Sequence, residues 1–463
     1  MVMLWSQTDL VEATAGDLLG DWGIDGITGV CIDSRTIKTN ELFVAIKGKR
    51  DGHNFVNDAI KLGAKAALVD HVPVEISSKT PLVLVSCVQE ALENLAKYRR
   101  KRSKAKLVAI TGSVGKTSSK NMLKTILELQ GKTHAAPASF NNHLGVPLTL
   151  ANLPMDATYA VVEIGMNKPG EIEPLAKMTS ADVVFITAIA EAHLVAFGDI
   201  AGIANEKAQI IKGLKRNGIA VLNAGTPCYE ILKKQTIENG NQLVSFSGSN
   251  SDIKAKNIQN INGKIKVQYE FKEKEFEFIL SSAGSHFAEN SLGVLLCVDC
   301  LGGDIEQASR DLEKWKPSDG RGSIEKISLP LGNIFLIDDA FNANPSSMKA
   351  ALSLLGQKNI YGNRRVAVLG DMLELGMKEV ELHEEISSWP ELAAIDIIHT
   401  VGPLMYNLHS KLPLNKKGCH YRNKIEIISD LENILRKGDI VLVKSSKSVG
   451  LSSIVNAIRD MKI

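Results

Sequence analysis

Residues 107–118, which read LVAITGSVGKTS, constrain the fold of this chain more than any other segment. The apolar run 107–110 predicts a buried strand, and a helical pattern begins at Ser118. Between them lies a loop with two glycines that ends in Lys-Thr. Glycine lets backbone N–H groups approach phosphate oxygens, and a helix N-terminus adds partial positive charge. We therefore expect a nucleoside triphosphate to bind at Thr111, Gly112, Ser113, Val114, Gly115, Lys116 and Thr117.

The spacing of this loop departs from the usual phosphate-loop pattern. That pattern has a glycine five residues before the last one, where this chain has Ile110. A strand-to-helix turn that binds nothing is therefore the alternative. If nucleotide binds, Lys116 is expected to reach the β- and γ-phosphates and Thr117 to contact Mg²⁺.

The chain has 463 residues, enough for several domains, and its strands and helices alternate as in parallel α/β folds. We predict three such domains, at 1–86, 87–316 and 317–463. The predicted strands are 42–46, 66–69 and 82–85 in the first; 107–110, 159–162, 183–187 and 219–222 in the second; and 334–337, 366–369, 395–401 and 440–443 in the third. Helices are expected at 57–62, 203–214 and 346–355, and residues 90–105 are expected to form a polar helix and a linker. Residues 264–280 alternate apolar and polar side chains, which predicts an antiparallel hairpin inserted in the second domain.

Charge and composition exclude several classes of protein. Lys and Arg number 54 against 52 Asp and Glu, so no overall field favours nucleic acid. The basic run 99–102 is interpreted as a solvated linker. No apolar run is long enough for a membrane span, and no signal peptide begins the chain, so we expect a cytoplasmic protein. The six cysteines are scattered, and Cys297 and Cys300 are interpreted as core thiols on a helix.

Three candidate side chains follow strands of the second domain, where ligands of parallel sheets gather. Glu163 ends one strand, where a carboxylate can hold Mg²⁺; the alternative is a surface acid. His193 lies in the loop after the next strand, and local chemistry favours a hydrogen-bonding or capping role. Lys207 is expected on a helix as a solvated lysine, although a half-buried lysine could instead form a carbamate that binds metal.

In the third domain, the polar loop 338–345 follows a strand directly. Asn342 and Asn344 in this loop could cap the next helix or could also bind a purine edge. Local chemistry leaves both roles open.

Ordered motifs along almost the whole chain resemble those of the Mur ligases, a family of ATP-dependent amide ligases. The motifs are Asp33-Ser-Arg35, residues 111–117, Asn141 to Pro147, Glu163-Ile-Gly165, Ala192-His-Leu194, Gly284 to Asn290, Gly320-Arg321, Asp338 to Pro345, Leu369 to Gly376 and Val443 to Lys447. The motifs at 141–147, 338–345 and 369–376 resemble those of the family member that joins D-alanyl-D-alanine to UDP-N-acetylmuramoyl-tripeptide.

This resemblance implies roles for individual residues. Ser34 and Arg35 are implied to bind the UDP precursor. Lys116 is implied to bind ATP phosphates, Thr117 and Glu163 one Mg²⁺, and His193 with a carbamylated Lys207 a second metal. Asn290, Asn342 and Asn344 are implied to meet adenosine, and Arg321 to contact phosphate. We expect a monomer that acts through an acyl phosphate in peptidoglycan precursor synthesis.

Some positions depart from the family pattern. Ala188 stands where an Asn is usual, Gln209 where a Glu is frequent, and Lys444-Ser-Ser-Lys447 replaces Lys-Gly-Ser-Arg. Because the Lys, Thr, Glu and His residues are present, we still expect an active enzyme. The alternatives are another Mur-type ligase, a folylpolyglutamate synthetase-like ligase, and a non-catalytic nucleotide-binding module.

Overall fold

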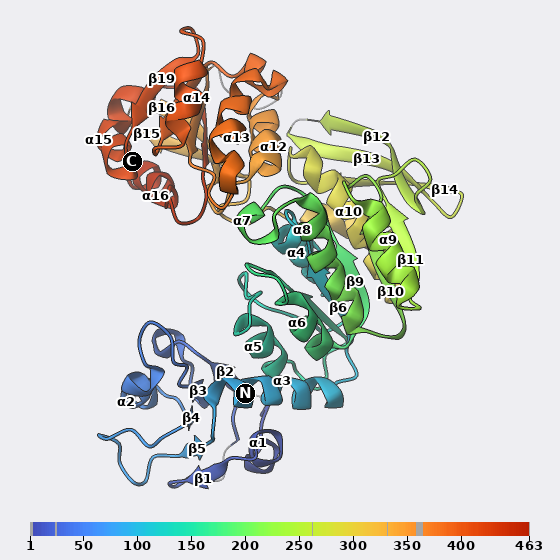
Figure 1. The fold of residues 1–463 in the computed structure, drawn as a ribbon, viewed down its shortest axis with the longest axis vertical. Helices are drawn as coiled ribbons and strands as arrows, with labels where there is room; N and C mark the ends of the chain where they lie inside the picture. Colours follow the sequence, from blue (N-terminus) through green and yellow to red (C-terminus); the bar gives the residue numbers. More distant parts are fainter. Residues whose placement is uncertain (1–2, 24–25, 262, 331, 358–363, 463) are drawn as a thin grey trace.

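The computed structural model describes residues 3–23, 26–261, 263–330, 332–357 and 364–462. They form three α/β units that follow one another along the long axis of the molecule (Figure 1). Each unit has its own sheet, of five, nine and six strands in chain order. The predicted fold class, three α/β units with an antiparallel insertion in the second, is confirmed.

The first sheet has the order β1-β5-β4-β3-β2 and is parallel except for β1. Its strands are β1 (Asp17–Leu19), β2 (Gly29–Cys31), β3 (Glu41–Val44), β4 (Ala66–Val69) and β5 (Leu82–Leu84). Its helices are α1 (Gln7–Thr14) and α2 (Val56–Lys61), followed by α3 (Val88–Arg102), which leads to the second unit. The predicted strands and helix of this unit are therefore present, each within two residues of the expected ends.

The second sheet has the order β14-β13-β12-β11-β10-β9-β6-β8-β7, with the phosphate-loop strand β6 (Lys106–Thr111) between two neighbours. Its other strands are β7 (Thr133–Ala135), β8 (Tyr159–Glu163), β9 (Ala181–Ile186), β10 (Leu214–Asn223), β11 (Gln242–Phe246), β12 (Ile253–Ile261), β13 (Lys264–Phe271) and β14 (Lys274–Leu280). The sheet is parallel from β7 to β12, and the predicted hairpin is the antiparallel pair β13–β14.

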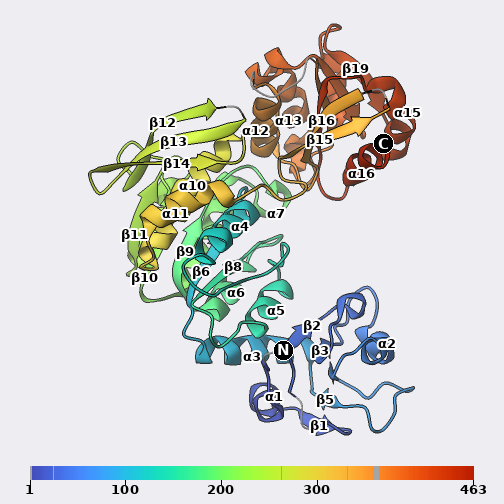
Figure 2. The same ribbon diagram turned by 180° about the vertical axis from the view of Figure 1, so that it is seen from behind.

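Both faces of this sheet are covered, which explains why its strands are continuously apolar. Val108 and Ile110 pack against α4 (Lys116–Leu127) and α10 (Ser285–Cys300), which lie side by side in Figure 2. Leu107 and Ala109 face α5 (Gly145–Ala151), α6 (Ile172–Thr179) and α8 (Ile200–Ala208). The remaining helices are α7 (Leu194–Phe197), α9 (Tyr229–Glu238) and α11 (Ile305–Asp311). Cys297 is fully buried on α10, as expected of a core thiol, and burial raises the pKa of its thiol.

The third sheet has the order β15-β16-β20-β17-β18-β19 and is parallel except for β15. Its strands are β15 (Ser323–Leu329), β16 (Gly332–Asp339), β17 (Arg364–Gly370), β18 (Ile397–Val401), β19 (Lys417–Tyr421) and β20 (Asp439–Lys444). Its helices are α12 (Pro345–Leu355), α13 (Glu379–Glu385), α14 (Met405–Lys411), α15 (Lys424–Ile434) and α16 (Ser452–Asp460). No helix among the described residues combines the length and apolarity that a membrane crossing requires.

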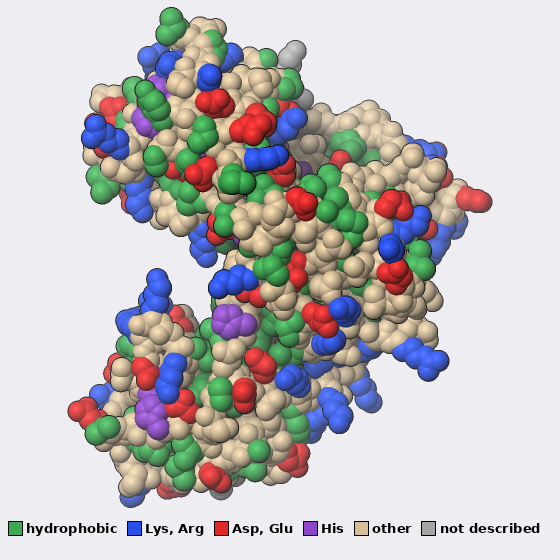
Figure 3. Space-filling model, viewed as in Figure 1, with side chains coloured by type: hydrophobic (Ala, Val, Ile, Leu, Met, Phe, Trp, Pro, Cys, Tyr) green, Lys and Arg blue, Asp and Glu red, His purple; other side chains and the backbone are tan. Residues whose placement is uncertain are grey.

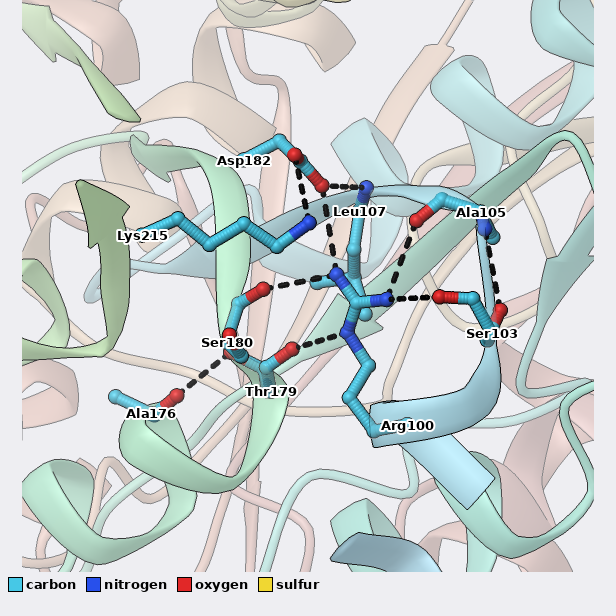
Figure 4. Close-up of polar contacts among 9 residues, drawn as sticks. All are labelled: Arg100, Ser103, Ala105, Leu107, Ala176, Thr179, Ser180, Asp182 and Lys215. Carbon is cyan, nitrogen blue, oxygen red and sulfur yellow. Dashed lines mark hydrogen bonds and ion pairs between the residues drawn. The ribbon is translucent and has the colours of Figure 1, made fainter. Parts of the chain in front are cut away.

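The interpretation of residues 99–102 as a solvated linker is wrong for Arg99 and Arg100. Both lie in the last turn of α3 and are less than 5% exposed, at 3% and 4%. Arg100 donates to the carbonyls of Thr179 at 2.6 Å and Ser180 at 2.8 Å, and to Ala105 O at 3.2 Å (Figure 4). A guanidinium offers five hydrogen-bond donors. It can therefore be buried where a helix end and a loop leave several backbone carbonyls without other partners.

The first unit is held to the second by bonds beyond the α3 connection. Arg99 donates to Leu4 O and to Leu153 O, each at 2.7 Å. The side-chain amide of Asn152 pairs with both backbone groups of Val30 at 2.9 Å. Since α3 also contributes side chains to the cores on both sides, these two units share one packed interface.

Candidate functional site

A cavity of about 840 Å³ lies between the second and third units. The phosphate loop and the end of β8 form its floor, and the loops after β16, β17 and β20 face them from the third unit. These loops all follow the carboxyl ends of parallel strands, where ligands of such sheets gather. Figure 3 also shows a wide opening between the first and third units, beside the second.

The phosphate loop has the backbone that a phosphate cradle requires. Gly115 has φ +82° and precedes α4 directly, and a Cβ there would lie 2.5 Å from Asn290 Nδ2. Only glycine therefore fits between the loop and Asn290 without a shift. Lys116 Nζ donates to Gly112 O at 2.6 Å, and burial lowers the pKa of this lysine. Its ammonium group lies over its own loop, beside the place where an anion would be held.

Glu163 at the end of β8 is buried and fully hydrogen-bonded. Its Oε2 accepts from the Thr117 hydroxyl at 2.8 Å. Its Oε1 accepts from Ser139 Oγ at 2.9 Å and from Asn141 Nδ2 at 2.8 Å. The alternative of a surface acid is therefore wrong, since Glu163 is 2% exposed. Adjacent hydroxyl and carboxylate oxygens beside a phosphate loop fit the ligand set of Mg²⁺.

Lys120 belongs to the same group of side chains, although no role was predicted for it from the sequence. Its side chain is fully buried on α4, one turn after Lys116, and burial lowers its pKa. It donates to Ala136 O and Ala138 O, both at 2.8 Å. These carbonyls precede Ser139, so Lys120 fixes the loop that presents hydrogen-bond donors to Glu163. A lysine among the apolar positions of the helix was the signal in the sequence.

His193 lines the cavity and is in contact with the third unit. It precedes α7 with φ +60°, and its Nδ1 lies against the carboxylate of Glu374 from the loop after β17. Burial lowers the pKa of His193; the Glu374 carboxylate opposes this shift, and Lys116 and Lys207 add to it.

Lys207 lies in α8 and is 2% exposed, so its interpretation as a solvated lysine is wrong. Burial, together with repulsion from Lys116, holds its pKa well below the ordinary value. Lys207 is not among the described residues that line the cavity. The helix predicted over 203–214 ends at Ala208, and a 3₁₀ turn (Gln209–Gly213) continues to β10.

The third unit contributes Arg321 and the loop after β16. Arg321 stacks on Phe341, with its guanidinium carbon 4.0 Å from the ring centroid, and burial lowers its pKa. Asn344 caps α12 by accepting from Ser347 N at 2.9 Å, so the predicted cap is confirmed. Asn342 and Asn344 both line the cavity as well.

Two further residues of the third unit, Asp339 and Lys444, belong to motifs found in the sequence, but no role in the site was predicted for them. Lys444 Nζ pairs with Asp339 Oδ2 at 2.7 Å and donates to Asn342 O at 3.0 Å. Both lysine and aspartate end neighbouring strands, β20 and β16, and line the cavity. Only the strand order, which the sequence does not reveal, brings them together.

The departures from the family pattern fit the local structure. Ser445 is fully buried, and it is not one of the residues with a positive φ, so this position does not need glycine. Lys447 lies 5.3 Å from the Phe341 ring, close to Arg321, and so still supplies a cation to the cavity. Gln209 donates to Asn205 O at 2.9 Å within its own helical segment. Ala188 accepts from Ser113 N through its backbone at 2.8 Å.

Ser34 and Arg35 lie elsewhere, on the first unit. They form a 3₁₀ turn after β2, capped by Asp33, and the side chain of Arg35 is 78% exposed. Arg35 Nε donates to Asp33 Oδ1 at 2.9 Å. Neither residue lines the cavity of the other two units.

Comparisons with known proteins agree with this three-part organisation. The family models match in order: "Mur ligase family, catalytic domain" at residues 26–104, "Mur ligase middle domain" at 110–298, and "Mur ligase, glutamate ligase domain" at 324–447. The chain belongs to the Mur ligase family.

Individual relatives and solved structures are similar to this chain over almost its whole length. The UDP-N-acetylmuramoyl-tripeptide–D-alanyl-D-alanine ligase of Rickettsia prowazekii is 37% identical over 460 residues, covering 98% of this chain and 99% of the relative. The crystal structure of MurF from Acinetobacter baumannii matches with a TM-score of 0.84 and 27% identity, covering 98% and 99% of the two chains. MurF ligase from Thermotoga maritima in complex with ADP matches with a TM-score of 0.77 and 26% identity, covering 94% of this chain and 97% of that one.

Proposed function

We propose that the chain is an ATP-dependent ligase that joins D-alanyl-D-alanine to UDP-N-acetylmuramoyl-tripeptide in peptidoglycan precursor synthesis. The observation that carries this proposal is the cavity in which Lys116, Thr117 and Glu163 face Arg321 and Lys444. A phosphate-binding loop on the second unit and cationic side chains on the third unit fit the transfer of a phosphoryl group between two bound substrates. The relatives of the same length carry the name of this ligase.

The chemistry explains why such a site is needed. A carboxylate is a poor electrophile, so the terminal carboxylate of the tripeptide attacks the γ-phosphorus of ATP, and ADP leaves. The dipeptide amine then attacks the acyl phosphate, and inorganic phosphate leaves. Lys116 and the loop N–H groups would stabilise the charge on the transferred phosphoryl group, and Arg321 would add to it from the opposite side. Enclosure between two units would keep water from the acyl phosphate.

The oxygen atoms of Thr117 and Glu163 fit a Mg²⁺ ion and would hold it. When bound, this ion would offset the repulsion between the phosphates and the attacking carboxylate. His193 and a carbamylated Lys207 would hold a second ion. A buried lysine with a lowered pKa is suited to carbamate formation, because the neutral amine is the form that reacts with CO₂.

The remaining site residues divide between adenosine and the UDP precursor. Adenosine would contact three asparagines. Asn290 lies against the phosphate loop, and Asn342 and Asn344 line the cavity from the third unit. Because Asn344 uses its side-chain oxygen as a helix cap, its NH₂ group is the part left for a ligand. Ser34 and Arg35 would contact the UDP precursor, which the first domain (1–86) would bind. The second domain (87–316) would bind ATP, and the third (317–463) would bind the dipeptide. A monomer in the cytoplasm, where ATP and nucleotide-linked precursors occur, completes the proposal.

Phosphate release tests this function. Purified protein would be given ATP, Mg²⁺, D-alanyl-D-alanine and UDP-N-acetylmuramoyl-tripeptide with lysine or diaminopimelate as the third residue. We expect release only when precursor and dipeptide are both present. Release with D-glutamate or a folate instead would indicate another Mur-type or folylpolyglutamate synthetase-like ligase. Nucleotide binding without release would indicate a non-catalytic module.

A further inference from the structure

Glu374 occupies an unusual position for a residue of the third unit. It belongs to the loop after β17, yet its carboxylate pairs with Nδ1 of His193 on the second unit. Both residues have left-handed backbones, with φ +66° for Glu374 and +60° for His193. Non-glycine residues rarely adopt this conformation, and where the surroundings enforce it, it often marks a functional site.

The loop that carries Glu374 is held rigidly. Met372 N donates to His383 Nε2 at 3.0 Å, and Leu373 N donates to Ser446 Oγ at 2.9 Å. The Asp371 carboxylate accepts from Met405 N at 2.8 Å. Glu374 therefore projects from a backbone fixed on three sides, although its own side chain is 60% exposed.

The other carboxylates that line the cavity accept hydrogen bonds, pair with a lysine, or lie on a helix of the second unit. Glu163 accepts from three side chains, and Asp339 is paired with Lys444. Glu171 accepts from the backbone of residues 167 and 168. Glu289 lies on α10, next to Asn290, and burial raises its pKa. Among the described lining residues, Glu374 is the carboxylate of the third unit that has neither a lysine nor an arginine partner.

Glu374 also lies at the phosphate end of the cavity. Its partner His193 lines the same cavity as Lys116 and the rest of the phosphate loop. The amine of the second substrate must attack a carbonyl carbon bonded to the phosphoryl group that Lys116 would hold. A group that orients this amine must therefore lie near His193, and it must be an anion if the amine arrives as an ammonium ion.

We propose that Glu374 binds the ammonium group of the amino substrate, D-alanyl-D-alanine or a similar amino acid derivative, and accepts one of its protons, which leaves an amine whose nitrogen faces the activated carboxyl group. This inference rests on the proposed ligase function and assigns a substrate-binding residue to it. The His193–Glu374 pair holds the carboxylate at this end of the cavity until the ammonium group arrives. An ammonium–carboxylate hydrogen bond is among the stronger kinds in proteins, so its loss has a measurable effect on substrate affinity.

Steady-state kinetics of Glu374→Gln test the inference. We expect the KM for D-alanyl-D-alanine to rise roughly 10- to 100-fold, as loss of a charged hydrogen bond implies, while the KM values for ATP and Mg²⁺ stay within about twofold of wild type. The matched control is Glu381→Gln, an exposed glutamate on α13 of the same unit, for which all three constants are expected to be unchanged.

The outcomes separate this inference from the ligase proposal. If the wild-type protein does not ligate the dipeptide, both fail. If wild type ligates but the dipeptide KM of Glu374→Gln equals that of Glu381→Gln, only the role of Glu374 is wrong. A rise in the KM for ATP or Mg²⁺ without a rise for the dipeptide would also overturn it, because Glu374 would then act through His193.

Discussion

The Thr117 hydroxyl donates to Glu163 Oε2 at 2.8 Å, although the two residues are 46 positions apart in the chain. The contact exists because β6 and β8 are neighbours in a parallel sheet, with Ile110 beside Glu163 in register. The phosphate loop and the end of β8 therefore open at the same edge. Ser139 and Asn141 hold the other carboxylate oxygen, so the carboxylate is fixed before any ion or nucleotide binds.

Glu163→Gln should remove a negative charge from this position with little change in shape. Because the amide is a weaker ligand for a divalent cation, we expect the KM for Mg²⁺ to rise and kcat to fall by roughly 100-fold or more. Titration of phosphate release with Mg²⁺ measures both. Thr117→Ser keeps the hydroxyl and serves as the matched control, with activity within about tenfold of wild type. Equal Mg²⁺ dependence in Glu163→Gln and wild type would exclude Glu163 as a metal ligand.

Lys116→Met should separate catalysis from stability. Burial lowers the pKa of Lys116, so removal of its charge favours the folded state, whereas loss of its hydrogen bond to Gly112 O disfavours it. We expect ATP turnover to fall by roughly 100-fold or more, while the free energy of unfolding changes by no more than about 1 kcal/mol because these two effects oppose each other. Near wild-type turnover in this variant would contradict the phosphate-cradle interpretation.

Lys120→Met should weaken the binding of Mg²⁺ and ATP, although Lys120 is not among the described residues that line the cavity. Without this lysine, Ala136 O and Ala138 O lose their buried donor, so we expect a loss of about 1–3 kcal/mol in the free energy of unfolding. Since the loop carrying Ser139 then loosens, the KM for Mg²⁺ and ATP should rise roughly tenfold. Lys124→Met, at a partly exposed position of the same helix, is the control for both measurements. A destabilised variant with unchanged KM values would limit Lys120 to a structural role.

The sequence predicted those parts of the molecule that local patterns determine. Apolar runs gave the central strands because both sheet faces are covered, so no alternation interrupts them. The short strand β7 and the edge strand β15 were not predicted, because a three-residue strand and a half-exposed strand show no comparable pattern. Helix α12 was predicted correctly because Asn344 and Pro345 are strong start signals.

The candidate site was predicted where it depends on one segment and missed where it depends on pairing between segments. The phosphate loop is local, and Glu163 follows its strand directly. The pairs Lys444–Asp339 and His193–Glu374 join residues whose proximity depends on strand order and on contact between units. The burial of Arg100 and Lys207 was likewise missed, because their local sequences do not show which segments pack over them.

Arg100→Met tests the buried guanidinium of Figure 4. The variant leaves the carbonyls of Thr179 and Ser180 without their donors, and each buried unpaired acceptor costs about 1–3 kcal/mol. We expect the free energy of unfolding to fall by about 2–4 kcal/mol, measured by urea denaturation. The neighbouring Lys101→Met, at an exposed position, should change it by less than about 0.5 kcal/mol. Equal stability of the two variants would show that water replaces the guanidinium.

Lys207→Ala tests whether the buried amine is carbamylated. Because burial lowers the pKa of Lys207, a larger share of its amine is neutral at pH 7 than for an exposed lysine, and only the neutral amine reacts with CO₂. We expect wild-type activity to rise when bicarbonate is added to CO₂-depleted enzyme. Lys207→Ala should lose most activity and regain part of it when acetate or propionate supplies the missing carboxylate. Exposed Lys212→Ala, in the turn that follows, should show neither effect. If bicarbonate has no effect on wild type and small carboxylates restore nothing in Lys207→Ala, Lys207 acts as an uncharged amine.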